Sequence, residues 1–538
     1  MRRCLAAGAI CIAPLVVVPG GVDFAHLPQS LYTQALALGA LAWALATARL
    51  PWRLNAPDAL LSAAACWAAL SLAWTPALLT GATLALQGVG CAAAYLLARW
   101  GPWPPRALLA GVFAAGVAVA GIGLAQIAGL DWPQRAEFLG ATLGNANAAS
   151  HIVVLALPCA LVVPRGAAAA GALVVVGYLL AAGSTTACVA ALAQIGAICS
   201  LRLERDERHL VLVLALACLA AALPALVVEL EPLGGLAQRL AMASNTMPMI
   251  ADHPFGVGLG GWSVTYPEYA QAVVPDPIYG LDTQPVRTHN DYLQVAAELG
   301  WVPVLIFTVG FVIFTVRSRF RPGNHGSRAG NHGSFHGSRL ALLGFAVLAL
   351  GSFPGQLPAA SWLAAICLGC ALRAPAGLAP GKWVTAGTFT GMAPALGGVC
   401  CAVALLATTH HATAIVADHH RRAAQNAARA HDWVQMEREY IEAWRLRPLD
   451  GRSLSHAGAA LLMQRRDREA VQLLEASLEL RPNQIHALSD LAVGLHRAGR
   501  RDEARRHMAR ALDLAPSSRR LLANARRLDV HAGEQPPN

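Results

Sequence analysis

An arginine, a histidine and an aspartate lie within five residues in the stretch RTHNDYLQVAAELGW, which runs from Arg287 to Trp301. The planar guanidinium of arginine stays charged and can make paired hydrogen bonds to phosphate oxygens. Histidine near neutral pH can accept a proton from an attacking hydroxyl. The stretch therefore suggests a site where Arg287 holds a phosphate group and His289 assists or positions a hydroxyl acceptor. Asp291 could orient His289, contact the acceptor, or interact with the positive end of a helix.

The rest of the chain is strongly apolar. Of its 538 residues, 56% are hydrophobic and only 13% are charged, and the mean hydropathy is positive. This composition is typical of a polytopic membrane protein rather than a soluble enzyme. The net charge of +10 would suggest nucleic acid in a soluble protein, but cationic residues between apolar segments more often set membrane topology. We therefore expect a lipid bilayer around most of the chain and no nucleic-acid partner.

Apolar runs near the length of a bilayer-crossing helix, roughly 17 to 25 residues, predict an all-α membrane domain with about 12–13 transmembrane helices. We expect this domain to occupy residues 1–408. The runs begin near Leu5, Leu31, Leu60, Leu79, Ala107, Ala149, Ala167, Thr185, Leu210, Trp301, Leu340, Leu357 and Trp383.

Arginines between the runs fall on every second side of the membrane, which predicts that this side is cytoplasmic. The alternation places residues 229–299 outside the cytoplasm as a long loop. It places residues 317–339, rich in Gly, Ser, His and Arg, in the cytoplasm as a low-complexity linker. The motif around His289 then lies at the end of the external loop. The runs from Leu340 and Leu357 leave one broken hairpin open as an alternative, which would move everything after Trp383 to the other side.

The last part of the chain is helical and charged, and it contains a repeat. Pro448, Pro482 and Pro516 are 34 residues apart, which is the period of a tetratricopeptide repeat. We therefore predict a tetratricopeptide-repeat α-solenoid over residues 409–538, outside the cytoplasm. Stacked helix pairs usually dock a peptide or a protein partner, and a stabilising cap on the membrane domain is the alternative.

The chain contains no Walker sequence and no glycine-rich dinucleotide turn. The stretch GVGLGGW, residues 256–262, follows ADHPF in the external loop, so we expect it to form a tight turn. Energy for group transfer must then come from an activated donor, and a lipid-linked diphosphate is such a donor. The histidines of the 317–339 segment lack carboxylate and cysteine companions, and we expect no metal and no cofactor.

Three stretches in order carry a family resemblance: LGNANAASHIVVLALP, then ADHPFGVGLGGWSVTYPEYA, then RTHNDYLQVAAELGW. Set among many spans, they resemble the O-antigen ligase and polymerase superfamily over roughly residues 31–372. The resemblance implies a metal-independent glycosyltransferase of the bacterial inner membrane that acts on the periplasmic face and uses an undecaprenyl-diphosphate-linked glycan. It implies that His289 is the essential loop histidine and that Arg239, ahead of the HPFGVG stretch, and Arg287 contact the diphosphate.

The chain departs from this family at one position. Many members carry a serine–arginine pair where this chain has Ser184 and Thr185, so a phosphate-binding arginine is either missing or replaced from elsewhere on the same face. Asn145 and Asn147 could contact a sugar or the diphosphate, or could cap a helix. Tyr266 could stack on a sugar ring, although an interfacial aromatic residue needs no function.

The acceptor stays open at this stage. Lipid A core would make the protein a ligase, another lipid-linked glycan would make it a polymerase, and a protein hydroxyl would make it an oligosaccharyltransferase. The repeats favour a protein partner slightly. Transport of a small anion would call for ion pairs inside the spans, which carry almost no charged residues. A non-catalytic assembly scaffold is the remaining alternative, and the Thr185 departure keeps it open.

Overall fold

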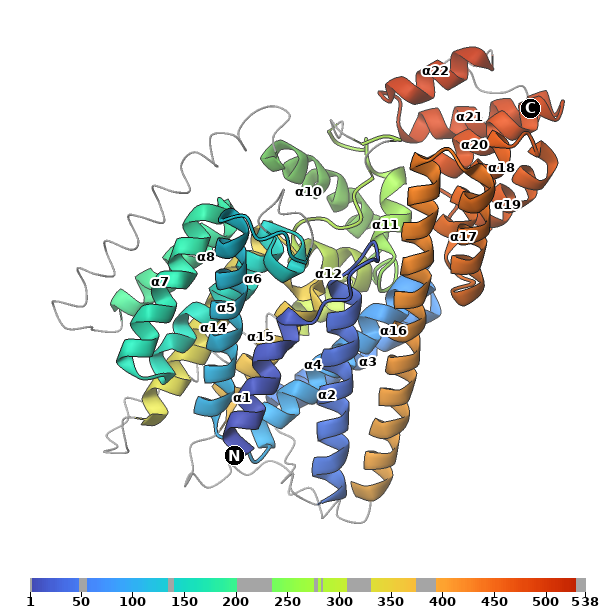
Figure 1. Ribbon diagram of the computed structural model, residues 1–538. Coiled ribbons are helices and arrows are strands. Elements are labelled where there is room, and N and C mark those ends of the chain that lie inside the picture. Colours follow the sequence, from blue (N-terminus) through green and yellow to red (C-terminus); the bar gives the residue numbers. More distant parts are fainter. Residues whose placement is uncertain are drawn as a thin grey trace.

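The computed structural model describes residues 2–47, 56–133, 140–200, 235–274, 279–281, 284–306, 330–373 and 393–528. In these residues the chain forms helices and no strand, which confirms the expected all-α fold. Figure 1 shows a helical bundle with a group of short helices at the end of the bundle opposite the start of the chain. The bundle helices are α1 (Arg2–Ile12), α2 (His26–Ala46), α3 (Ala56–Leu70), α4 (Leu78–Trp100), α5 (Pro105–Ile127), α6 (Ala146–Ala156), α7 (Arg165–Ala182), α8 (Thr185–Ser200), α14 (Gly330–Gly351), α15 (Pro358–Leu372) and α16 (Ala393–Arg429).

Several of the bundle helices have the length and hydropathy of membrane-spanning helices. Among the described residues, six helices are long and apolar enough to cross a bilayer. The span predicted from Leu210 and most of the one predicted from Trp301 lie outside the described residues. The total of twelve or thirteen spans therefore stays a prediction. The six helices are Ala56–Ala73, Leu78–Trp100, Pro105–Ile127, Arg165–Ala182, Ser334–Gly351 and Ala395–Arg429.

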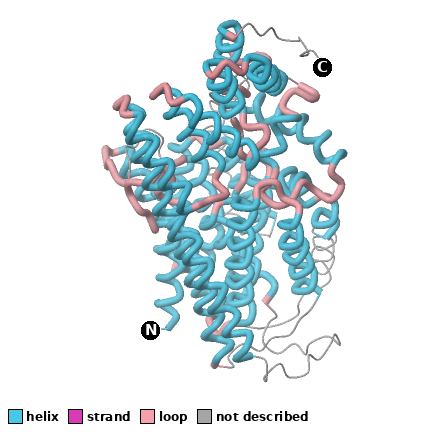
Figure 2. Tube along the Cα trace, turned by 90° about the vertical axis from the view of Figure 1, so that its right-hand side faces the viewer, coloured by secondary structure: helices cyan, strands magenta, loops and turns pink. Residues whose placement is uncertain are grey.

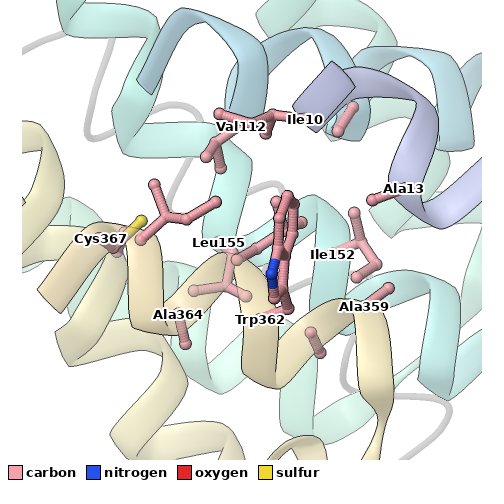
Figure 3. Close-up of a cluster of buried hydrophobic side chains, with 14 of the residues drawn as sticks. Ile10, Ala13, Val112, Ile152, Leu155, Ala359, Trp362, Ala364 and Cys367 are labelled. Atoms are coloured by element: carbon pink, nitrogen blue, oxygen red, sulfur yellow. The ribbon is translucent and has the colours of Figure 1, made fainter. Parts of the chain in front are cut away.

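Helix α15 lies in the middle of the bundle core. Figure 3 shows Trp362 of α15 packed among Ile152 and Leu155 of α6 and Ala359 of its own helix. Small residues let the surrounding helices approach closely, and a Cβ atom at Gly116 of α5 would collide with Ala156 of α6. This core fixes the short connection between α14 and α15, residues 352–357, which contains the 3-10 turn η6 (Pro354–Gln356).

Two expectations concern the segment before α15. Helices α14 and α15 are joined by the short connection 352–357. Ser334–Gly351 is long and apolar enough to cross a bilayer, whereas α15 is a shorter apolar helix, so the broken hairpin stays open as an alternative. The predicted linker over residues 317–339 is corrected in its last ten residues, which belong to α14, while residues 317–329 lie outside the described part. Glycine and serine residues in the first part of α14 pack against neighbouring elements. Ser338 is fully buried, and a Cβ atom at Gly337 would lie 3.0 Å from the Pro158 carbonyl oxygen. Small residues serve close helix contact here.

The bundle also contains a buried ion pair that composition did not predict. Arg99 Nε lies 3.4 Å from Asp58 Oδ1, and the two side chains are 4% and 2% exposed. Tyr95 donates a hydrogen bond to Asp58 at 2.6 Å and accepts one from Arg99 at 2.6 Å. Asp58 lies in the first turn of α3 and Arg99 in the last turn of α4, where the helix dipoles favour these charges. The pair therefore joins two helix ends rather than lining a path between the spans.

Beyond the bundle lie six short helices, called the repeat helices below. Every second one begins 34 residues after the one before, at Trp433, Asp467 and Arg501, as the proline spacing indicates. The tetratricopeptide assignment itself stays a prediction. Helix α16 runs without a break through the predicted domain boundary at residue 408. The six helices are α17 (Trp433–Leu446), α18 (Gly451–Met463), α19 (Asp467–Leu480), α20 (Ile485–Arg497), α21 (Arg501–Leu514) and α22 (Arg519–Arg527).

Candidate active site

The loop that is predicted to be external, called the long loop below, folds around a glycine turn in its described residues. The described part of the loop contains α10 (Gly235–Asp252), α11 (Trp262–Thr265), η5 (Tyr266–Glu268) and α12 (Asp291–Leu299). Gly256, Gly258 and Gly260 all have positive φ angles, of 79°, 91° and 77°, a conformation that glycine adopts without strain. The Gly258 N–H donates to the Glu298 carbonyl at 2.9 Å, and a Cβ atom at Gly256 would collide with the same carbonyl. The predicted tight turn is confirmed, and it holds the end of α12.

His289 stands just before α12 in a strained backbone conformation. Its φ angle is +55°, a left-handed region that costs a residue other than glycine on the order of 1–3 kcal/mol. The neighbouring residues hold it there. Thr288 Oγ1 donates to the Asn290 carbonyl at 2.6 Å and accepts from the Asn290 N–H at 3.1 Å, while Asn290 Oδ1 caps α12 by accepting from Leu293 N at 3.0 Å. The imidazole is therefore positioned by a rigid helix start.

Phe353, in the connection between α14 and α15, brings Arg287 and His289 together. The Arg287 guanidinium carbon lies 4.6 Å from the centre of the Phe353 ring, a cation–π contact. The His289 ring lies 5.0 Å from the same ring, at 79° to it. Sequence reasoning treated this segment, SFPGQLP, only as a break between spans. An aromatic residue beside the prolines of a span boundary was the one signal that could have pointed to it.

The surroundings of His289 keep its imidazole neutral. Burial, together with the positive charges of Arg239 and Arg287, lowers the pKa of His289 to about 4. Arg239 comes from α10, so the structure brings both predicted arginines close enough to act on the histidine. Burial also lowers the pKa of Arg287, against the carboxylates of Asp23 and Asp291, and a guanidinium stays charged under such shifts. The site thus combines two cations with a neutral nitrogen base.

Asp291 begins α12, as one of its predicted roles requires. Its Oδ2 accepts a hydrogen bond from the Gly355 N–H at 2.7 Å, which ties α12 to the connection between α14 and α15. Burial raises the pKa of Asp291 to about 7, although the Gly355 N–H and the Arg287 charge oppose the shift. This carboxyl group therefore changes charge near neutral pH.

The other predicted contacts have structural roles. Asn145 Oδ1 accepts from Asn147 N at 2.8 Å and from Ala148 N at 3.3 Å, so Asn145 caps α6, and Asn147 is exposed at the same helix start. Tyr266 is fully buried and stacked on Trp262 with ring centres 4.3 Å apart. The expectation that Tyr266 contacts a sugar is corrected, because its ring has no face open to a ligand.

Tyr266 is buried because the repeat helices pack against the loop. One apolar cluster contains Met242, Trp262 and Tyr266 of the loop together with Met508 and Leu512 of α21. Polar contacts surround it: Glu268 Oε1 accepts from Asn483 at 3.0 Å and from Arg510 at 3.1 Å. The repeat helices therefore pack on the loop that carries His289. In the side view, short helices lie at the end of the bundle away from the start of the chain (Figure 2).

Residues 170–308 match the family model described as O-antigen ligase. The matched segment includes most of α7, all of α8 and the long loop with Arg239, Arg287 and His289. No curated protein matches the chain.

Proposed function

We propose that the chain, whose residues 170–308 match the O-antigen ligase family model, moves a glycan from undecaprenyl diphosphate to a hydroxyl acceptor on the periplasmic face of the inner membrane. An O-antigen ligase-like transfer of glycans fits both the family and the multi-pass membrane fold. The observation that carries the proposal is His289, a neutral histidine in a strained conformation beside two arginines.

The arginines are proposed to bind the leaving group. Arg287 and Arg239 act on His289 from two different elements, and a diphosphate held by both would lie next to the imidazole. Each guanidinium can make paired hydrogen bonds to phosphate oxygens. Their two positive charges can stabilise the negative charge that grows on the diphosphate as the glycosidic bond breaks. Such stabilisation supports transfer without a metal ion.

His289 is proposed to serve the acceptor. Its lone pair accepts the hydroxyl proton while the acceptor oxygen forms a bond to the anomeric carbon and the carbon–oxygen bond to the diphosphate breaks. The electron pair of that bond leaves with undecaprenyl diphosphate. A pKa near 4 makes His289 a weak base in the free protein, but a bound diphosphate offsets the arginine charges and raises the pKa. Donor binding therefore makes His289 a stronger base.

One observation favours a second candidate acceptor. The repeat helices share an apolar core with the long loop, so a protein docked on these helices would be held near His289. A protein hydroxyl acceptor would make the activity that of an O-oligosaccharyltransferase. Incubating the purified protein with extracted lipid-linked glycan and either lipid A core or candidate proteins distinguishes the two, because only the true acceptor gains the glycan.

Two substitutions test the proposal. His289→Ala should reduce transfer at least about 100-fold, the lower range for a lost general base, and Arg239→Ala should reduce it by a similar factor through the lost diphosphate contact. His253→Ala is the matched control, because this loop histidine lies against Tyr269, at 6.5 Å between ring centres. Transfer of lipid-linked glycan is measured for variants that insert and accumulate as the wild type does. Full transfer in both test variants would overturn the assignment.

A further inference from the structure

His151 is a buried polar side chain that the proposed chemistry does not use. It lies on α6 and is 1% exposed. Both of its ring nitrogens are buried and have no hydrogen-bond partner among the described residues. Its ring centre lies 6.4 Å from that of Phe353, at 85°. Phe353 is also the ring that contacts His289 and Arg287, so His151 borders the same site from inside the bundle.

An unpaired imidazole at this position is costly. A buried polar group without a partner destabilises a protein by about 1–3 kcal/mol, and buried polar atoms normally have partners. The neighbours of His151 along α6, Ile152 and Val153, are fully buried and apolar. A phenylalanine would suit packing alone at least as well. The cost is explained if the imidazole meets a polar ligand.

Buried hydroxyl groups without a hydrogen-bond partner also occur at the start of α8. Ser184 is 4% exposed, and its hydroxyl and that of Thr185 are buried without a partner among the described residues. They stand at the N-terminus of a 16-residue helix, where unpaired N–H groups favour an anion. This helix start packs on the end of α14: a Cβ atom at Gly351, two residues before Phe353, would lie 3.2 Å from Thr186 Oγ1.

We propose that His151, Ser184 and Thr185 form an inner wall of the donor site, which takes a phosphate oxygen of the lipid-linked diphosphate through neutral hydrogen-bond donors. The proposal rests on the proposed function and deepens it: Arg239 and Arg287 hold the diphosphate from the loop side, and the inner wall holds it from the bundle. It also gives Thr185 a role at the position where the family resemblance leads one to expect an arginine. His151 here binds the donor and moves no proton.

The substitution His151→Phe separates ligand binding from packing. If His151 only packs, removing an unpaired polar group leaves the protein equally or more stable and leaves donor binding unchanged. If it binds the diphosphate, affinity falls. The measurement is binding of undecaprenyl diphosphate, with undecaprenol as the phosphate-free comparison, to the full-length protein in nanodiscs. KM and kcat of transfer are measured in parallel.

We expect His151→Phe to weaken undecaprenyl diphosphate binding at least tenfold, to leave undecaprenol binding unchanged, and to raise KM for the donor more than it lowers kcat. His151→Gln, which keeps a donor, should recover part of the affinity, and Ser184→Ala should weaken it about threefold. His253→Phe, the same replacement in the long loop rather than in the bundle, is the control and should change none of these values.

Unchanged affinity for undecaprenyl diphosphate in His151→Phe overturns the proposal that the inner wall binds the diphosphate. If that variant does not accumulate, unchanged affinity in both His151→Gln and Ser184→Ala overturns it instead. An equal loss of undecaprenol binding would also overturn it, since the wall would then contact the lipid and not the phosphate. The proposed function fails on a different result, full transfer by His289→Ala and Arg239→Ala, so the two failures are distinguishable.

Discussion

At the scale of single residues, His289 illustrates how position and charge combine. Its left-handed backbone conformation is unfavourable for a residue other than glycine, and the hydrogen bonds of Thr288 and Asn290 maintain it. Burial and two arginines keep it neutral. A histidine kept only for packing would need neither the strained backbone nor the cationic neighbours.

The lowered pKa of His289 predicts an unusual pH profile. Protonation removes the lone pair, so kcat/KM should fall as the pH drops through about 4, the pKa in the free protein. In the donor complex the pKa is higher, and the fall in kcat should occur at a higher pH. Arg239→Gln removes one of the charges that lower the pKa, so its kcat/KM profile should break at a higher pH than the wild-type profile. An unmoved break in this variant would contradict the role of Arg239.

The raised pKa of Asp291 predicts a pH-dependent stability. The unfolded chain loses this proton near the ordinary pKa of 3.8, and the folded protein keeps it to about 7. The contribution to stability is therefore full below pH 4 and is lost as the pH rises to 7. Asp291→Asn stays neutral and can still accept a hydrogen bond from Gly355. At pH 8 its free energy of unfolding should therefore exceed that of the wild type by on the order of 1–2 kcal/mol, after allowing for partial exposure, and it should melt at a higher temperature. Melting below pH 3.8 is the control, because the wild-type carboxyl is then largely protonated in the folded and the unfolded chain, and the two proteins should differ little.

The site could be predicted from the sequence only in part. Arg287 and His289 are expected from their residue types in one short stretch, and Arg239 is expected from the family resemblance; the structure places both arginines near His289. The contact of Phe353 with His289 could not be predicted, because it depends on how α14 and α15 pack. A sugar contact is one alternative for Tyr266, and the burial that argues against it comes from helices more than two hundred residues later.

At the scale of elements, the glycine turn should determine whether the site forms. Gly256→Ala places a Cβ atom against the Glu298 carbonyl in a left-handed conformation. We expect it to lower the free energy of unfolding by about 2 kcal/mol or more and to lower transfer, because α12 carries His289 at its start. Gly88→Ala on α4 is the matched control, since its Cβ atom would meet nothing within 4 Å, and it should be neutral or slightly stabilising. Equal melting temperatures for both variants would contradict this role.

Helix boundaries show a further limit of sequence patterns. The apolar runs predicted the bundle helices well, because a bilayer requires continuous apolar helices. The first residues of α14 look like a linker, since hydropathy measures only apolar side chains. Gly337 and Ser338 instead provide room for the neighbouring turn at Pro158. A helix that packs through small residues has little hydropathic signal.

At the scale of the whole molecule, the repeat helices and the long loop that carries His289 form one packed unit. Helix α16 passes from the bundle directly into the repeats, and Asp418 of α16 accepts a hydrogen bond from Asp23 N at 2.7 Å in the connection between α1 and α2. The apolar cluster around Trp262 and Met508 joins the same repeats to the loop. The side of the membrane that holds the repeats must therefore be the side that holds His289.

This packing makes the orientation of the chain testable from its end. Alkaline phosphatase fused after Asn538 should be active, and green fluorescent protein fused there should be dark, because the loop and repeats are proposed to face the periplasm. A phosphatase fusion after Gly101, in the turn between α4 and α5, is the control and should be inactive, because Arg99 and Arg106 predict that this turn is cytoplasmic. A fluorescent fusion after Asn538 with inactive phosphatase would place the repeats in the cytoplasm. Since the repeats pack on the loop, His289 would move with them, and a periplasmic lipid-linked donor could no longer reach it.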